Sequence, residues 1–181
     1  GYQKLFNVPA YAFKELEICK DKFESTRTLW ELVNNWNEKY LFWMESQFTN
    51  INVEDVDREL QTFFKDSYNL HKRINNQVSE LLKDKITDFK AIMPNVLDLG
   101  NPNMRSRHFE KLFKLINQNY YEGMPFSLGL MIRSNIMSFK DAIAETSAQA
   151  SGEAQLEDSL AKIVNSWSST KFTVLNHRDQ H

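Results

Sequence analysis

Hydrophobic residues recur every three or four positions through the first third of the chain. The lead-in ends at Pro9, which disfavours a helical conformation at Val8, and the spacing becomes regular from about Phe13. It continues for about four heptads and predicts one long amphipathic helix with a heptad-like seam. The seam residues are Leu16, Cys19, Phe23, Thr26, Trp30, Val33, Asn37, Tyr40 and Met44. Four further apolar residues widen this face: Leu29, Leu32, Trp36 and Trp43. A face this wide favours packing against more than one helix.

A second long helix is predicted after a break at residues 49–52. Asn52 is suited to capping its N-terminus, and the acidic residues that follow suit the positive end of the helix dipole. Apolar residues continue at helical spacing until Pro94, which is predicted to end the helix. Such a helix has about 40 residues and a length of about 60 Å. A compact domain of this size is only about 30 to 40 Å across. Residues 1–94 are therefore predicted to form a long antiparallel helical pair, with His71 on its solvated surface.

Residues 95–181 are predicted to form a smaller helical bundle with a terminal extended segment. Asn103 is expected to cap a helix over residues 104–117, and Ser127 a shorter helix that ends near Arg133. Another helix is expected from about Ser138, with a break in the small-residue stretch 148–152 before an amphipathic helix that ends near Trp167. The alternating residues 171–177 predict one short strand. The predicted fold class is all-α: an elongated antiparallel helical bundle, or rod, with that strand at its C-terminal end.

The stretch from Met104 to Phe113 is unusual because it places Arg105 and Arg107 in the first turn of a helix. Positive charge at that position opposes the helix dipole. A local conflict of this kind is typical of a functional site or of a specific tertiary partner. The alternative is that both arginines are solvated or paired with acidic residues of the long helices.

The composition of the chain argues against several classes of function. The 181 residues are 41% hydrophobic and 25% charged, as in ordinary folded proteins, and the net charge of −2 gives no electrostatic reason to expect nucleic acid or an anionic membrane as partner. No apolar run approaches the length of a transmembrane helix. The single Cys19 excludes an internal disulfide and a cysteine-based zinc site. Because the chain begins at Gly1 without a methionine, we expect it to be a fragment of a longer protein.

Residues with catalytic or ligand-binding spacing are not apparent. The chain has no glycine-rich phosphate loop, and its four histidines lack metal-ligand spacing. A catalytic pair of Cys19 and His108 is disfavoured because Cys19 falls on the predicted core seam. The sequence therefore predicts no catalytic residue, no metal site and no cofactor site in this segment.

Two motifs of the chain carry a resemblance to a known family. The first is Arg107-His108-Phe109, and the second is the succession from Ala150 to Trp167. Their order and spacing resemble the N-terminal half of the linker region of dynein heavy chains. The first motif is similar to the Arg-His-Trp of that family, with an aromatic ring kept at Phe109 but the indole donor lost. The second is similar to a later family block of Ala, Glu, Leu-Glu, Leu, Ile and Trp. The lead-in ending at Pro9 resembles axonemal more than cytoplasmic heavy chains.

The resemblance implies a mechanical function. In this family the linker is a helical lever that arches over a ring of AAA+ ATPase modules, and its swing drives movement along microtubules. ATP and Mg²⁺ are expected in the ring of the parent chain and no cofactor in this segment. The implied partners are the ring itself, neighbouring tail helices, and intermediate chains, light chains and microtubules of the parent complex, with no nucleic acid and no membrane. The implied location is the axoneme of a cilium or flagellum, with the cytoplasm as the alternative.

The resemblance also assigns expected roles to particular residues. Arg107, His108, Phe109 and Trp167 are expected to be signature packing residues, whereas Arg105 and Arg107 are candidate contacts to the ring or to a partner. Residues 100–103 and 151–152 are candidate hinges by composition. The alternative function is a passive, spectrin-like helical scaffold, which is disfavoured because the two helical arms share no repeat beyond the heptad.

Overall fold

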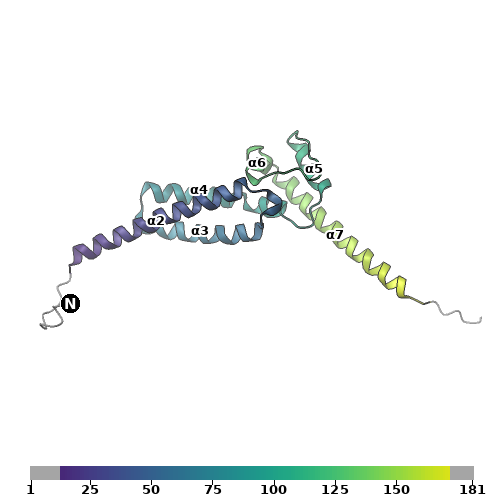
Figure 1. Cartoon of the computed structure of the whole chain (residues 1–181), viewed down its shortest axis with the longest axis horizontal. Helices are drawn as coiled ribbons and strands as arrows, with labels where there is room; N and C mark the ends of the chain where they lie inside the picture. The colour runs from purple at the N-terminus through teal and green to yellow at the C-terminus, as the bar shows by residue number, and fades with distance from the viewer. Residues whose placement is uncertain (1–12, 172–181) are drawn as a thin grey trace, which may run out of the picture.

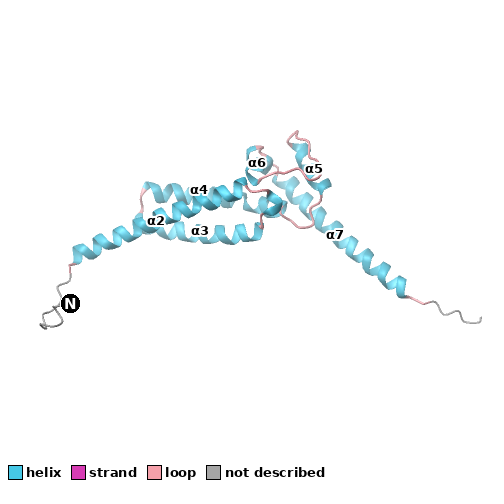
Figure 2. Cartoon of the chain, in the orientation of Figure 1, coloured by secondary structure: helices cyan, strands magenta, loops and turns pink. Residues whose placement is uncertain are grey.

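The computed structural model describes residues 13–171, and these residues fold into helices joined by short loops (Figure 2). The elements are α2 (Lys14–Glu45), η1 (Phe48–Asn50), α3 (Val53–Ile74), α4 (Gln77–Leu99), α5 (Ser106–Leu115), α6 (Leu128–Arg133), η2 (Ile136–Ser138) and α7 (Lys140–Ser169). Within the described residues no strand forms, and the one β-type pairing is an isolated bridge between Gln47 and Ser127. The predicted all-α class is confirmed. The strand predicted over residues 171–177 lies outside the described residues except for its first position.

The helices α2, α3 and α4 form an elongated bundle, and α2 extends beyond its end (Figure 1). Aromatic rings fill its centre. Trp43 stacks on Phe89 with ring centroids 5.7 Å apart, and Trp36 presents its edge to Phe63 at 5.5 Å. Offset and edge-on arrangements of this kind add to the stabilisation from burial alone. The bundle therefore has a broad aromatic core along α2.

The predicted seam of α2 was placed on the wrong face. The residues of α2 that are buried are Leu29, Trp36 and Trp43, which the pattern had treated as additions to the seam. The seam residues Leu16, Phe23 and Trp30 are exposed, and Val33, Tyr40 and Met44 are half-buried. Both faces carry large apolar residues at helical spacing, so the position of α3 and α4 decides which one is covered. The first turns of α2 lie beyond both helices.

The second predicted helix is two helices, so the expectation of a single 40-residue helix was wrong. The chain turns at Asn75, which adopts a left-handed conformation with φ of 46°. Asparagine tolerates this conformation better than most residues. Asn76 then caps α4, because its side-chain oxygen accepts a 2.8 Å hydrogen bond from the backbone N–H of Ser79. The cap at Asn52 is confirmed, since its side chain accepts hydrogen bonds from the backbone of Glu54 and Asp55.

The structure differs from two further predictions about residues of this bundle. His71 is half-buried, and its Nδ1 lies 3.0 Å from the Ser79 hydroxyl across the α3–α4 turn, so it is not simply a solvated residue. Pro94 does not end a helix, because α4 continues through it to Leu99. The position chosen to divide the chain, between residues 94 and 95, thus lies inside α4.

In the second half of the chain, α5 packs against α7, whereas α6 packs against α2 and the short helix η2 (Figure 1). Gly100 ends α4 where the chain touches the start of α3, and a Cβ there would collide with the side chain of Val53. Gly129 in α6 lies against α2, where a Cβ would come within 2.6 Å of the Met44 carbonyl oxygen. Ser127 caps α6 as predicted, with its hydroxyl accepting from the Leu130 N–H. The second half is thus joined closely to one end of the bundle, where α2 ends, α3 begins and α4 ends.

The helix α7 is continuous, so the break expected at residues 148–152 does not occur. Within that stretch only Ala150 is buried, and it continues a buried face of α7 that includes Thr146 and Ser147 one turn earlier. Gly152 is on the exposed side of the helix with no side chain near it. Beyond Ala154 every described residue is exposed, and this part of α7 projects away from the rest of the fold (Figure 1).

Candidate functional site

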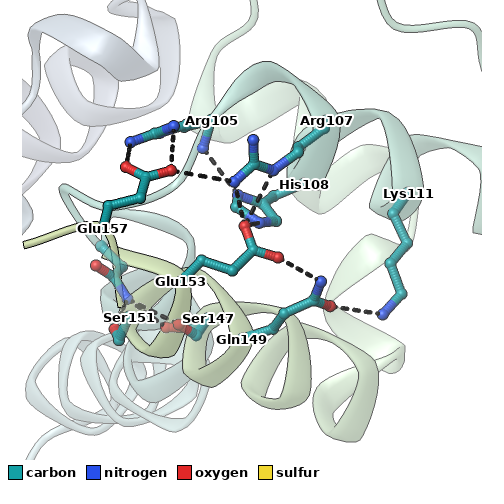
Figure 3. Close-up of polar contacts among 10 residues, drawn as sticks. Arg105, Arg107, His108, Lys111, Ser147, Gln149, Ser151, Glu153 and Glu157 are labelled. Carbon is teal, nitrogen blue, oxygen red and sulfur yellow. Dashed lines mark hydrogen bonds and ion pairs between the residues drawn. The ribbon is translucent and has the colours of Figure 1, made fainter. Parts of the chain in front are cut away.

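Both arginines at the start of α5 point toward α7, where two glutamates receive them (Figure 3). Arg105 forms a two-pronged contact with Glu157: Nη1 donates to Oε1 at 2.8 Å, and Nη2 donates to Oε2. Arg107 donates from Nε to Glu153 Oε2 at 3.0 Å, and its Nη2 donates to the same oxygen. Glu153 and Glu157 are four residues apart, so one face of α7 presents both carboxylates.

His108 connects the start of α5 to the same glutamate. Its ring is only 2% exposed, and Nδ1 accepts a 3.0 Å hydrogen bond from the backbone N–H of Arg105. This bond supplies the cap of α5, a role that had been assigned to Asn103; the N–H of Asn103 instead donates to Asn101. Because Nδ1 accepts, the ring proton is on Nε2, which donates to Glu153 Oε2 at 3.1 Å. One buried imidazole therefore caps α5 and ties it to α7.

We call the group Arg105, Arg107, His108, Glu153 and Glu157 the α5–α7 clamp. Glu153 is at its centre, and its second oxygen accepts a 2.7 Å hydrogen bond from Gln149 Nε2. The Gln149 hydrogen bond and then the Arg107 hydrogen bond lower the pKa of Glu153 to about 2, against a smaller opposing effect of desolvation. Hydrogen bonds donated to a carboxylate favour its charged form. Glu153 is thus held ionised throughout the neutral and mildly acidic range.

Two further contacts extend the attachment along α7. The side-chain amide of Asn101, in the loop before α5, donates to the Ser147 carbonyl, the Ser147 hydroxyl and the Ser151 hydroxyl at 3.0, 3.0 and 2.8 Å. Lys111 reaches Gln149 Oε1 at 3.4 Å on the other side of the clamp (Figure 3). Together these bonds fix the loop and α5 against α7 over about three helical turns.

The residues singled out from the sequence fall in different environments. Arg105 and Arg107 pair within the chain, and the pairing is with α7 rather than with the long helices. Phe109 is half-buried and stacks on Tyr120 at 5.8 Å between ring centroids. Trp167 is 62% exposed on the projecting part of α7, outside the core of the described residues.

Sequence reasoning missed Glu153 and Glu157 as partners of the arginines. The sequence did contain a sign of this pairing. Two carboxylates four residues apart lie on the same face of a helix and can bind two basic side chains there. The partners are 46 and 52 residues from Arg107 and Arg105, however, and no local pattern links positions so distant.

Residues 13–171 also lack two other kinds of site. No group of three or more His, Cys, Asp or Glu side chains there is placed to hold a metal ion. No helix in this part of the chain is both long and apolar enough to span a bilayer. The polar groups gathered at the clamp bind helices to one another, so fold and site define a structural helical segment.

Comparison with known proteins identifies the family. The family model described as "Dynein heavy chain, N-terminal region 2" matches residues 16–181, so the chain belongs to the dynein heavy chain family. It is 30% identical to dynein axonemal heavy chain 6 of Homo sapiens over 181 residues, which is 99% of this chain. It is 28% identical over 176 residues, or 96% of this chain, to the dynein-1-beta heavy chain of the flagellar inner arm I1 complex of Chlamydomonas reinhardtii. The chain spans about 4% of the length of each relative.

Proposed function

We propose that this chain is a non-catalytic lever segment in the linker of an axonemal dynein heavy chain. In this function it transmits the ATP-driven conformational change of an AAA+ ring into microtubule-based movement. The observation that carries the proposal is the α5–α7 clamp, since it fixes α5, which follows the bundle helix α4 in the chain, to a helix that projects away from the bundle. The family assignment supports it, because the matched region is N-terminal and lies in a motor chain.

Force transmission requires joints that do not slip under load. The bundle α2–α4 supplies stiffness, because close-packed interiors have low compressibility and transmit strain. The clamp supplies a directional joint, since the two-pronged contact of Arg105 with Glu157 fixes the orientation of the two groups as well as their distance. A load on α7 would therefore reach the bundle through α5 and through the contact of α7 with α4.

The rest of the motor would be supplied by the parent chain and its complex. We propose that ATP and Mg²⁺ bind in the AAA+ ring of the same chain, which is also the first partner of this segment. Arg105 and Arg107, both about half exposed, are the candidate contacts to that ring or to another partner. Neighbouring tail helices, intermediate and light chains, and microtubules are partners of the parent complex. The proposed location is the axoneme of a cilium or flagellum, in keeping with the names of the relatives.

The experiment uses the full heavy chain and distinguishes a lever function from that of a passive scaffold. Arg105→Glu with Arg107→Glu should lower microtubule gliding velocity severalfold per ATP turned over, because α5 and α7 then repel each other. Adding Glu153→Arg and Glu157→Arg restores opposite charges and should recover most of the velocity. A control with the same charge change, Lys114→Glu with Lys162→Glu, breaks only ion pairs within single helices and should have little effect.

A scaffold that only tethers partners predicts the same velocity per ATP in all of these variants. An unchanged gliding velocity per ATP in the variant Arg105→Glu with Arg107→Glu would therefore contradict the lever function. Loss of velocity that the reciprocal swap does not recover would show that the arginines act on something other than the clamp.

A further inference from the structure

A groove runs along the surface of the bundle between α2 and α3. It consists of three hollows of about 400, 650 and 240 Å³ in line. The first two share Leu32, Asn35 and Asp66 in their walls, and the last two share Lys39, Phe42 and Glu59. Its wall on α2 extends from Thr28 to Trp43, which corresponds to about 22 Å of helix. The groove is thus long enough to hold about four turns of another helix.

The floor of the groove is apolar and its walls are acidic. Leu32, Phe63 and Leu70 form the floor, and Phe42 stands beside it with 61% of its surface exposed. Five carboxylates against two basic groups line the three hollows: Glu31, Glu38, Asp55, Glu59 and Asp66 against Lys39 and Arg73. This excess is local, because the whole chain has a net charge of only −2.

Two of these carboxylates could accept further hydrogen bonds. Glu59 Oε1 accepts from Lys39 Nζ at 2.8 Å, but its other oxygen, Oε2, is buried and has no hydrogen-bond partner. Buried polar atoms normally have a partner, so such an atom calls for an explanation. Asp66, in the wall that the first two hollows share, makes no ion pair with any residue of the described chain. A donor from outside could pair with Asp66 directly, and with Glu59 Oε2 after a side-chain rotation that exposes this oxygen.

We propose that the α2–α3 groove is a docking site for a cationic amphipathic helix of a partner protein. Apolar side chains of that helix cover the floor and Phe42, and its arginines or lysines pair with the carboxylates of Asp66 and Glu59, the second turning to expose Oε2. Helices that lay an apolar face into a groove are a recurrent mode of recognition. The acidic walls select against acidic helices, because like charges brought together in a binding site oppose association. This surface is distinct from the clamp and goes beyond the lever function.

The experiment measures binding of two designed peptides to the 181-residue chain by fluorescence anisotropy at low salt. One labelled helical peptide of about 15 residues has leucines on one face and arginines on both flanks, and the other has glutamate in place of each arginine. We expect saturable binding of the arginine peptide only, and weaker binding as salt screens the charges. Glu59→Gln with Asp66→Asn should raise its dissociation constant about tenfold, because both carboxylates lose the charge that pairs with the arginines of the peptide.

Control variants separate docking from a change in folding. Phe42→Ala should weaken binding severalfold while the far-ultraviolet circular dichroism stays unchanged, because this side chain is largely exposed. Asp84→Asn on α4 removes one charge outside the groove and should leave binding as in the wild type.

Three results would overturn the proposal. The first is absence of saturable binding of the arginine peptide at low salt, and the second is equal binding of both peptides. The third is a self-association of the chain, seen by sedimentation, that the groove variants abolish while neither peptide binds; the groove would then be an interface between copies.

Discussion

Different interactions stabilise the two halves of this molecule. The bundle α2–α4 is joined by large aromatic and aliphatic side chains that interlock out of contact with water. The joint between α5 and α7 relies on three basic groups, two carboxylates and a row of small residues on α7. Burial of a large apolar side chain stabilises a fold by about 1.5–3 kcal/mol, whereas an exposed ion pair contributes about 0.2–1 kcal/mol. The bundle should therefore respond to lost volume, and the clamp to pH and salt.

The largest effect is expected in the aromatic core. Trp43→Ala should lower the free energy of unfolding by about 3–5 kcal/mol, because it leaves a cavity among the rings of Trp36, Phe63 and Phe89. Urea denaturation followed by circular dichroism measures the change. Trp30→Ala is the matched control on the same helix, since Trp30 is 56% exposed, and it should change stability by about 0.5 kcal/mol or less. Equal losses in both variants would contradict the burial assigned to α2.

A smaller loss is expected when the buried imidazole of the clamp is removed. His108→Ala deprives the Arg105 N–H and Glu153 of their partner and should cost about 1–3 kcal/mol. His108→Asn keeps an acceptor near the position of Nδ1 and should recover the part that comes from capping. The same denaturation experiment compares the two variants. If both lose the same stability, the cap contributes nothing.

The most specific effect is the pH dependence of Glu153. The pKa of this carboxyl is about 2 in the folded chain, against an ordinary value of 4.5, so its contribution to stability is complete above about pH 4.5. That contribution is lost as the pH falls from about 4.5 to about 2. Glu153→Gln should therefore flatten the curve of unfolding free energy against pH in this window. Gln149→Ala should narrow the window, because it removes the largest cause of the shift. Parallel curves for wild type and Glu153→Gln would contradict the assignment.

Local signals in the sequence predicted much of the fold. The caps at Asn52 and Ser127 follow from side chains that bond to the backbone two or three residues away, so neighbouring residues determine them. The turn at Asn75 and Asn76 had such a signal too. It was masked because Leu70, Ile74 and Val78 continue the apolar spacing across the turn.

The features that the sequence could not predict depend on which helix surfaces pack against each other. The choice between two apolar faces of α2 depends on the position of α3 and α4, which no local pattern contains. The small residues of α7 suggested a break, but in the fold they permit close approach of neighbouring helices at Thr146 and Ala150. The clamp partners were missed for the same reason, since the arginines and glutamates are distant along the chain.

The continuity of α7 has a geometric consequence. The clamp holds α7 as far as Glu157, and every residue from Asp158 to Ser169 is exposed on the part of the helix that projects from the fold, so a rotation at the clamp would move the end of α7 on an arc. That stretch is about 18 Å long, so each degree of rotation at the clamp would displace its tip by about 0.3 Å. A change of side-chain contacts too small to alter the packing of α5 would become a displacement of several ångströms where the chain leaves this segment.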